Sequence, residues 1–220
     1  MKKIQVLGMR IEDYTTRESH MLLENYLNDA TFHVIETLTM ERLFCVPEDV
    51  LVRETMEESD LLIVGQPEIL KETGVVTPQR LREVREKDFF KEFFHCMVQN
   101  DKKVFLLGWT VRDLEHFWEY VSANVEEWRP VASYALSECV GDTATVVNEM
   151  NSSMAQVIVS CLPMKEEAQF LSSHKGKISA SVWYGVDKTY AEPNQGLFRM
   201  ISGMVKQKKL HNEMIKSKKN

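Results

Sequence analysis

The sequence predicts an α/β fold, a Rossmann-like sandwich in which helices cover both faces of a mostly parallel sheet. Short apolar runs alternate with longer amphipathic stretches along the 220 residues, and this strand–helix alternation is typical of such folds. Several runs are continuously apolar, as in strands that are buried on both faces. No linker rich in Gly, Ser or Pro interrupts the pattern. We therefore expect one domain over residues 1–195, followed by a C-terminal helix and basic tail over residues 196–220.

Short apolar segments mark the predicted strands. The runs LLIV at 61–64 and VFLL at 104–107 are entirely apolar and bounded by polar residues, so they predict strands in the centre of a layered fold. The other runs are similar in length but less uniform. In chain order, the predicted strands are residues 4–7, 32–36, 61–64, 104–107, 130–134, 156–160 and 178–183.

The segments between these runs carry apolar residues at helical spacing. Residues 16–27 and 111–125 place apolar side chains three and four positions apart, which gives a helix one apolar face. Residues 78–98 do the same behind Pro78, a residue suited to the first turn of a helix. The acidic stretch 48–60 is interpreted as a solvated helix face. The predicted helices are residues 16–27, 78–98, 111–125, 142–150 and 165–171, with a last one from about residue 195 into the tail.

Composition and charge exclude several classes of protein. The chain is 44% hydrophobic with a net charge of −6, so neither disorder nor a broad basic surface for nucleic acid is predicted. The charge is uneven, because residues 206–220 carry +5 and the remainder −11. The N-terminus lacks the apolar run of a signal peptide, and every apolar run is shorter than a membrane span. We therefore expect a cytoplasmic protein.

No pattern of metal-binding or cofactor-binding residues stands out. The four cysteines are widely spaced and are expected to be buried thiols, and the histidines show no metal-ligand spacing. The glycine fingerprints of NAD and ATP sites are absent, so we expect no cofactor. In open α/β sheets, ligands bind at the carboxyl ends of the strands. The loops that would form such a site are residues 37–41, 65–70, 108–112, 160–167 and 184–187.

Six motifs, taken in order along the chain, resemble those of one enzyme family. VLGMRIEDYT at 6–15 is similar to "LGVxIDNLT", HVIETLTME at 33–41 to "VTxNPE", and SDL at 59–61 to the start of "ADLVLPDGxG". VFLLG at 104–108 is similar to "VFLLGG", VNEMNS at 147–152 to an "IN-S" stretch, and VSCLPMKEE at 159–167 to "VGLGSPKQE". Their order and spacing resemble the TagA/WecG/CpsF glycosyltransferases over about residues 4–187.

The resemblance implies transfer of a hexose or N-acetylhexosamine from a UDP-sugar. The implied acceptor is a glycan linked to undecaprenyl diphosphate, used in the synthesis of bacterial cell-surface polysaccharides. The family's arginine-bearing motif "RVTGxDL" maps roughly onto Arg82 or Arg85, which would face the acceptor diphosphate. The donor-binding residues that the resemblance implies are Thr37, Thr39, Gly108, Trp109, Lys165, Glu166, Glu167 and Gly185.

Several positions depart from the family pattern. The aspartate expected to act as general base falls on Gly65, and a glycine cannot accept a proton from the acceptor hydroxyl. The family asparagine falls on Thr39, the glutamine of "PKQE" on Glu166, and the second glycine of "VFLLGG" on Trp109. If the chain is active, another carboxylate must act as the base. The nearby candidates are Glu36, Glu41 and Glu68.

These departures leave a second interpretation open. The chain would then be a relative that has lost catalysis and acts as a nucleotide-sugar-binding or scaffold subunit, as a homo-oligomer or beside an active partner subunit. In either case the basic tail would suit an anionic membrane surface, which would place the protein at the inner face of the membrane. The lysines that would make this contact are Lys206, Lys208, Lys209, Lys216, Lys218 and Lys219.

Overall fold

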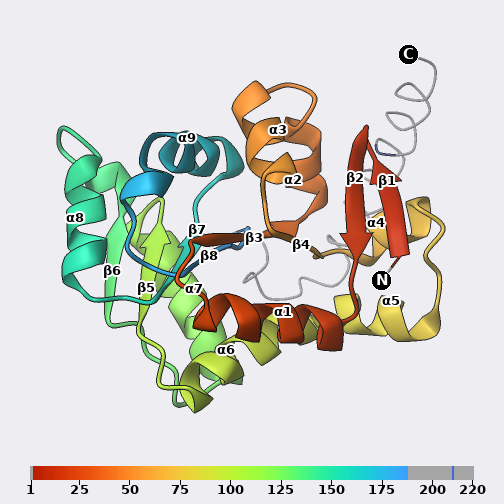
Figure 1. Ribbon diagram of the computed structural model, residues 1–220, viewed down its shortest axis with the longest axis horizontal. Coiled ribbons are helices and arrows are strands. Elements are labelled where there is room, and N and C mark those ends of the chain that lie inside the picture. The colour runs from red at the N-terminus through yellow and green to blue at the C-terminus, as the bar shows by residue number, and fades with distance from the viewer. Residues whose placement is uncertain (1, 188–209, 211–220) are drawn as a thin grey trace.

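The computed structural model describes residues 2–187 and Leu210 (Figure 1). Within this part of the chain, six parallel strands form one sheet in the order β4-β3-β8-β7-β5-β6, beside a two-stranded antiparallel sheet, β1-β2. This confirms the α/β fold with a parallel sheet. The strands of the large sheet are β3 (His33–Leu38), β4 (Leu61–Val64), β5 (Val104–Gly108), β6 (Ala132–Ala135), β7 (Val157–Cys161) and β8 (Val182–Gly185).

Helices cover both faces of the six-stranded sheet (Figure 1). On one face, α1, α6 and α7 pack on the strands through an aromatic core that includes Phe90, Phe94 and Phe117. On the other face, α8 and α9 cover β5, β7 and β8, while α2 and α3 lie beside β3 and β4. The helices are α1 (Thr16–Asn28), α2 (Met40–Cys45), α3 (Val50–Glu57), α4 (Pro67–Glu72), α5 (Pro78–Arg85), α6 (Asp88–Gln99), α7 (Val111–Asn124), α8 (Ala144–Ser152) and α9 (Met164–His174), with short 3-10 turns at Leu136–Glu138 and Lys175–Lys177.

The first predicted strand lies outside the large sheet. It is β1 (Lys2–Val6), and it pairs antiparallel with β2 (Met9–Asp13), a strand that the sequence analysis did not predict. Leu7 and Gly8 join the two strands with positive φ angles of 47° and 86°, as a two-residue hairpin turn requires. The apolar face of this hairpin packs on α2, α3 and α4.

The long helix predicted over residues 78–98 is two helices. Lys87 adopts a left-handed conformation, with φ 57° and ψ 41°, and separates α5 from α6. Two further short helices, α2 and α4, begin in the predicted loops 37–41 and 65–70. Thr39 caps α2 by accepting a hydrogen bond from the Arg42 amide at 3.3 Å, and Pro67 occupies the first position of α4. The chain therefore turns from strand to helix directly at the carboxyl edge of the sheet.

The expected C-terminal helix and basic tail lie outside the described residues, with the exception of Leu210. That side chain is fully buried in the core that α2, α3, α4 and the hairpin share.

Candidate functional site

A buried group of charged side chains lies on one face of the sheet where β3, β8 and β7 approach their carboxyl ends. The strand register aligns Glu36 with Gly185 and Gly185 with Ser160 across these three strands. Gly185 has no side chain, and the carboxyl group of Glu36 occupies the space above it. A Cβ atom at position 185 would lie 2.1 Å from Oε2 of Glu36. Glycine is therefore required here by a close side-chain approach.

Arg42, from α2, lies at the centre of this buried group. Its Nη1 donates a hydrogen bond to Glu36, its Nη2 lies 2.7 Å from Oε2 of Glu167, and its Nε lies 3.9 Å from Oδ2 of Asp187. The side chains of Arg42, Glu36 and Glu167 are at most 1% exposed. Trp183 also donates to Oε1 of Glu167 at 3.0 Å. One guanidinium thus joins α2, β3, α9 and the segment after β8. We call Arg42, Glu36, Glu167 and Asp187 the Arg42 cluster.

The Arg42 cluster contains three carboxyl groups and one guanidinium. Burial and the neighbouring charge of Glu167 raise the pKa of Glu36 well above its usual range, although Arg42 opposes this shift. Burial also raises the pKa of Glu167. Burial disfavours the charge of Arg42, but the surrounding carboxylates, Glu167 foremost, raise its pKa. The guanidinium therefore stays charged, and the cluster favours retention of a proton on Glu36.

Thr37 and Thr39, both expected to bind the donor, have protein partners. Side chains alternate between the faces of a strand, so Thr37 points away from Glu36, where its hydroxyl donates to Tyr184 Oη at 3.2 Å. The hydroxyl of Thr39 donates to Oδ2 of Asp187 at 2.9 Å. Both threonines are fully buried. The structure thus brings Glu36, Thr37, Thr39, Glu167 and Gly185 together at one end of the sheet.

Gly65 lies at the same edge. It follows β4, and its amide donates to the Leu38 carbonyl at 2.9 Å. Glu68, in the first turn of α4, is half-buried, whereas Glu41, in the first turn of α2, is exposed. Glu36 is buried and paired with Arg42. Among the three carboxylates considered as substitute bases, Glu68 combines partial exposure with a position three residues after Gly65.

The loop after β5 is built differently from a phosphate cradle. Gly108 is closely packed, since a Cβ atom there would lie 2.8 Å from Leu114. The backbone amide of Thr110 donates to the Asp113 carboxylate at 3.0 Å, and the Thr110 hydroxyl accepts from the Asp113 amide at 3.2 Å. A carboxylate of the chain itself therefore caps the start of α7. Trp109 is half-buried beside this turn.

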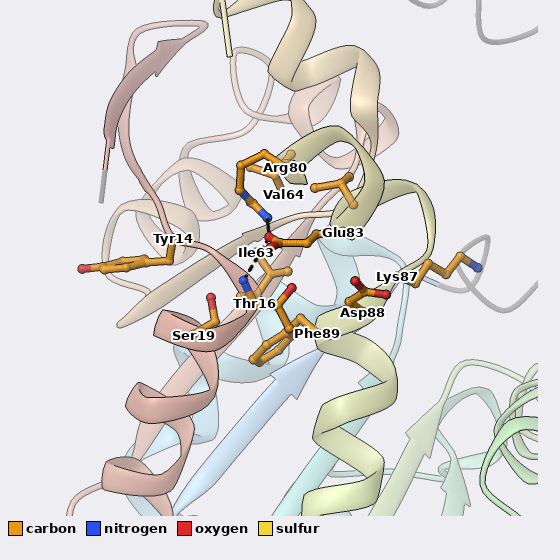
Figure 2. Close-up of a pocket in the computed structure, with 11 residues that line it drawn as sticks. Tyr14, Thr16, Ser19, Ile63, Val64, Arg80, Glu83, Lys87, Asp88 and Phe89 are labelled. Carbon is orange, nitrogen blue, oxygen red and sulfur yellow. Dashed lines mark hydrogen bonds and ion pairs between the residues drawn. The ribbon is translucent and has the colours of Figure 1, made fainter. Parts of the chain in front are cut away.

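Sequence reasoning missed the inward-facing arginine of α5. Arg82 and Arg85 are exposed, and Arg82 pairs only loosely with Glu86 at 3.8 Å. Arg80 is mostly buried and lies 2.7 Å from both Oδ1 of Asp13 and Oε2 of Glu83. Figure 2 shows Glu83 between Arg80 and the start of α1, where it accepts a hydrogen bond from the Thr16 amide at 3.2 Å.

Arg80 borders a small pocket at the carboxyl end of β4 (Figure 2). The pocket volume of about 10 Å³ suits a single water molecule. Hydrogen bonds from Gln79 and Arg80 lower the pKa of Glu83 despite the opposing effect of burial. Charged residues on a short helix are usually solvated, so no sequence signal separated Arg80 from its neighbours. The pocket is lined by Tyr14, Thr16, Ser19, Ile63, Val64, Arg80, Glu83, Val84, Lys87, Asp88 and Phe89.

Other features of the described residues limit the kinds of site. Residues 2–187 and Leu210 contain no cluster of His, Cys, Asp or Glu arranged to hold a metal ion. All four cysteines are free; Cys96 and Cys161 are buried, whereas Cys45 and Cys139 are only half-buried. In this part of the chain, no helix is both long enough and apolar enough to cross a membrane.

The sequence matches a known enzyme family over most of its length. The model of the glycosyl transferase WecG/TagA/CpsF family covers residues 4–207 of the 220, a range that includes the Arg42 cluster, Gly65 and Arg80. A comparison with curated protein sequences gives no match. The extent of the family match, together with polar residues gathered at the carboxyl edge of a parallel sheet, shows that this chain belongs to the WecG/TagA/CpsF family of glycosyltransferases.

Proposed function

We propose that this chain transfers a hexose or N-acetylhexosamine from a UDP-sugar to a glycan linked to undecaprenyl diphosphate. The reaction would take place at the carboxyl edge of β3, β4, β7 and β8. The observation that carries the proposal is the Arg42 cluster at this edge. Buried charges cost free energy and gather at functional sites, and this edge is where open α/β sheets bind ligands.

The start of α9 is the proposed place for the donor diphosphate. Pro163 precedes the helix, and no described side chain caps its first amides. Such amides favour an anion. Lys165 in the first turn is exposed and adds a positive charge. The half-buried Glu166 beside it would then contact the sugar, whose hydroxyl groups are hydrogen-bond donors.

We propose Glu68 as the general base for the acceptor hydroxyl. The family's aspartate position is Gly65, and Glu68 is the half-buried carboxylate that follows it in α4. Glu36 is less suited, because it is enclosed and bonded to Arg42. Glu41 is exposed to solvent. A general base contributes about 10²- to 10⁴-fold to such a reaction.

Arg80 is the proposed contact for the acceptor diphosphate. When Asp88 and Phe89 are placed on the "DL" of the motif "RVTGxDL", its arginine position falls on Glu83. Arg80 lies three residues earlier in α5 and contacts Glu83, so both side chains share one face of the helix. Arg80 would then supply the positive charge near β4, in place of Arg82 or Arg85. Arg80 donates three of its five N–H groups to Asp13 and Glu83, so a diphosphate would take the place of one of these carboxylates.

A second function is favoured by two observations. The hydroxyls of Thr37 and Thr39 are bonded to Tyr184 and Asp187, and the base position is a glycine. A chain with such a site could bind a nucleotide sugar without transferring it, and act as a scaffold or partner subunit. The proposed membrane contact through the tail lysines is compatible with either function, and so is a homo-oligomer.

Calorimetry with UDP and UDP-N-acetylhexosamines, combined with an assay of UDP release in the presence of a lipid-linked glycan acceptor, tests both functions. The proteins are the wild type, Gly65→Asp, Glu68→Gln and the matched control Glu92→Gln, whose side chain is exposed on α6. Transfer with Glu68 as base predicts release that falls at least about 100-fold in Glu68→Gln and persists in the control. If the wild type binds a UDP-sugar but releases no UDP, and Gly65→Asp does release UDP, the result would support the subunit that has lost catalysis. Absence of saturable binding at millimolar ligand would refute both the transfer and the binding of a nucleotide sugar, and would leave a scaffold subunit as the remaining function.

A further inference from the structure

We infer that Arg42 is a positioning residue that holds the donor site together without contacting the donor. The inference rests on the proposed function only for its binding readout. Arg42 is enclosed by Glu36, Glu167 and Asp187, so it does not reach solvent or a substrate. Its partners, however, belong to the segments from which the proposed donor site is built.

Arg42 links two helix starts that lie far apart in the sequence. Its own helix, α2, is capped by Thr39, which also donates to Asp187. Glu167 lies in the first turn of α9, beside Lys165 and Glu166. The Nη2 atom of Arg42 lies 2.7 Å from Oε2 of Glu167 and 3.5 Å from the Leu162 carbonyl just before that helix. Arg42 therefore fixes the α9 start relative to α2.

The planar guanidinium makes this arrangement specific. Three nitrogen atoms of Arg42 face three different carboxyl groups, a fork geometry that a lysine ammonium cannot reproduce. Replacement of Arg42 by lysine should thus loosen the site, whereas the same replacement at the exposed Arg53 of α3 should preserve it.

In Arg42→Lys, the affinity for UDP would fall because the groups that bind UDP are displaced, and not because a direct contact between residue 42 and UDP is lost. Misplacement of a binding group by about 1 Å can reduce its effect by up to about 100-fold. We therefore expect Arg42→Lys to weaken UDP binding by at least about tenfold. Asp187→Asn, which removes one charge of the cluster and keeps a hydrogen-bonding oxygen for Thr39, provides a milder second variant and should weaken binding by a smaller factor.

The experiment combines UDP calorimetry with hydrogen exchange on the full chain. The proteins are the wild type, Arg42→Lys, Asp187→Asn and the matched control Arg53→Lys, whose side chain is exposed on α3. We expect faster exchange in Arg42→Lys over residues 39–45 and 160–167, with exchange in α8 unchanged, and near-wild-type exchange and affinity in Arg53→Lys. Unchanged exchange in both segments of Arg42→Lys would overturn the inference.

The two readouts separate the inference from the proposed function. If the wild type binds no UDP, the proposed donor site fails and the exchange data alone decide the role of Arg42. If the wild type binds UDP and Arg42→Lys binds it equally well, the positioning role is refuted while the proposed function stands. If Arg42→Lys fails to fold, exchange over residues 160–167 in Asp187→Asn decides the question. Exchange as slow as in the wild type would then refute the inference.

Discussion

A double-mutant cycle between Gly185 and Glu36 tests the close approach of the Glu36 carboxyl group to the backbone of β8. In Gly185→Ala, the new Cβ atom would lie 2.1 Å from Oε2 of Glu36 and 2.5 Å from its Cδ. The Glu36 side chain is fully enclosed, so it can move only by leaving Arg42. Overpacking costs about 1–3 kcal/mol, and loss of a hydrogen bond to a charged group costs about 1.5–3 kcal/mol. We expect Gly185→Ala to lower the free energy of unfolding by about 3 kcal/mol or more.

The second variant of the cycle, Glu36→Ala, removes the side chain with which the new Cβ atom collides. In Glu36→Ala the carboxyl group is absent, so the three atoms nearest to a Cβ at position 185 are removed. The double variant should therefore be more stable than the sum of the single effects predicts, with an interaction energy of about 2 kcal/mol, within the range for residues in contact. Urea unfolding at pH 7, followed by the fluorescence of the buried Trp183, measures all four proteins. Additive effects, or a Gly185→Ala variant as stable as the wild type, would refute the steric reasoning.

Three further predictions follow from buried charges and thiols. The pKa of Glu36 is higher in the folded than in the unfolded chain. Its contribution to stability is therefore complete below its ordinary pKa of 4.5 and is lost as pH rises towards the folded pKa. Urea unfolding between pH 4.5 and 8 should show that Glu36→Gln lacks this loss, and parallel pH profiles of the two proteins would contradict the prediction. Arg80→Met leaves Asp13 and Glu83 without their cation and should cost about 3–5 kcal/mol, whereas the exposed control Arg82→Met should change the unfolding free energy by no more than about 0.5 kcal/mol. Burial raises the pKa of Cys161 to about 12, so a thiol reagent at pH 8 should modify it only after unfolding. Mass spectrometry of labelled peptides measures this, and rapid labelling of the native protein would show that the Cys161 thiol is not buried.

Much of the fold follows from short-range patterns. The apolar runs predicted all six strands of the large sheet, with ends that differ by a few residues. The hairpin was missed because its turn depends on Leu7, a residue with no preference for positive φ. The break at Lys87 has the same origin, since neither Gly nor Pro marks it. Backbone conformations that packing imposes leave no signal in the local sequence.

The candidate site was predictable where it depends on topology. The carboxyl ends of parallel strands meet at one edge, so loops containing Thr37, Glu167 and Gly185 were expected to converge. Arg42 and Arg80 were not found, because a charged residue on a helix normally faces solvent. Their burial depends on partners that are distant in sequence, 120 or more residues away for Arg42 and Glu167 and 67 for Arg80 and Asp13.

The position of β8 in the sheet has a consequence for the order in which the protein can fold. β3 and β4 form one edge of the sheet, β5, β6 and β7 the other, and the last strand, β8, lies between them. During synthesis, the two halves remain unconnected by strand pairing until residues 182–185 have left the ribosome. Pairings between strands so distant in sequence form slowly. The Arg42 cluster needs Asp187 as well, so the site can form only after nearly the whole domain has been made, and chains that end before β8 would expose two unpaired strand edges to aggregation.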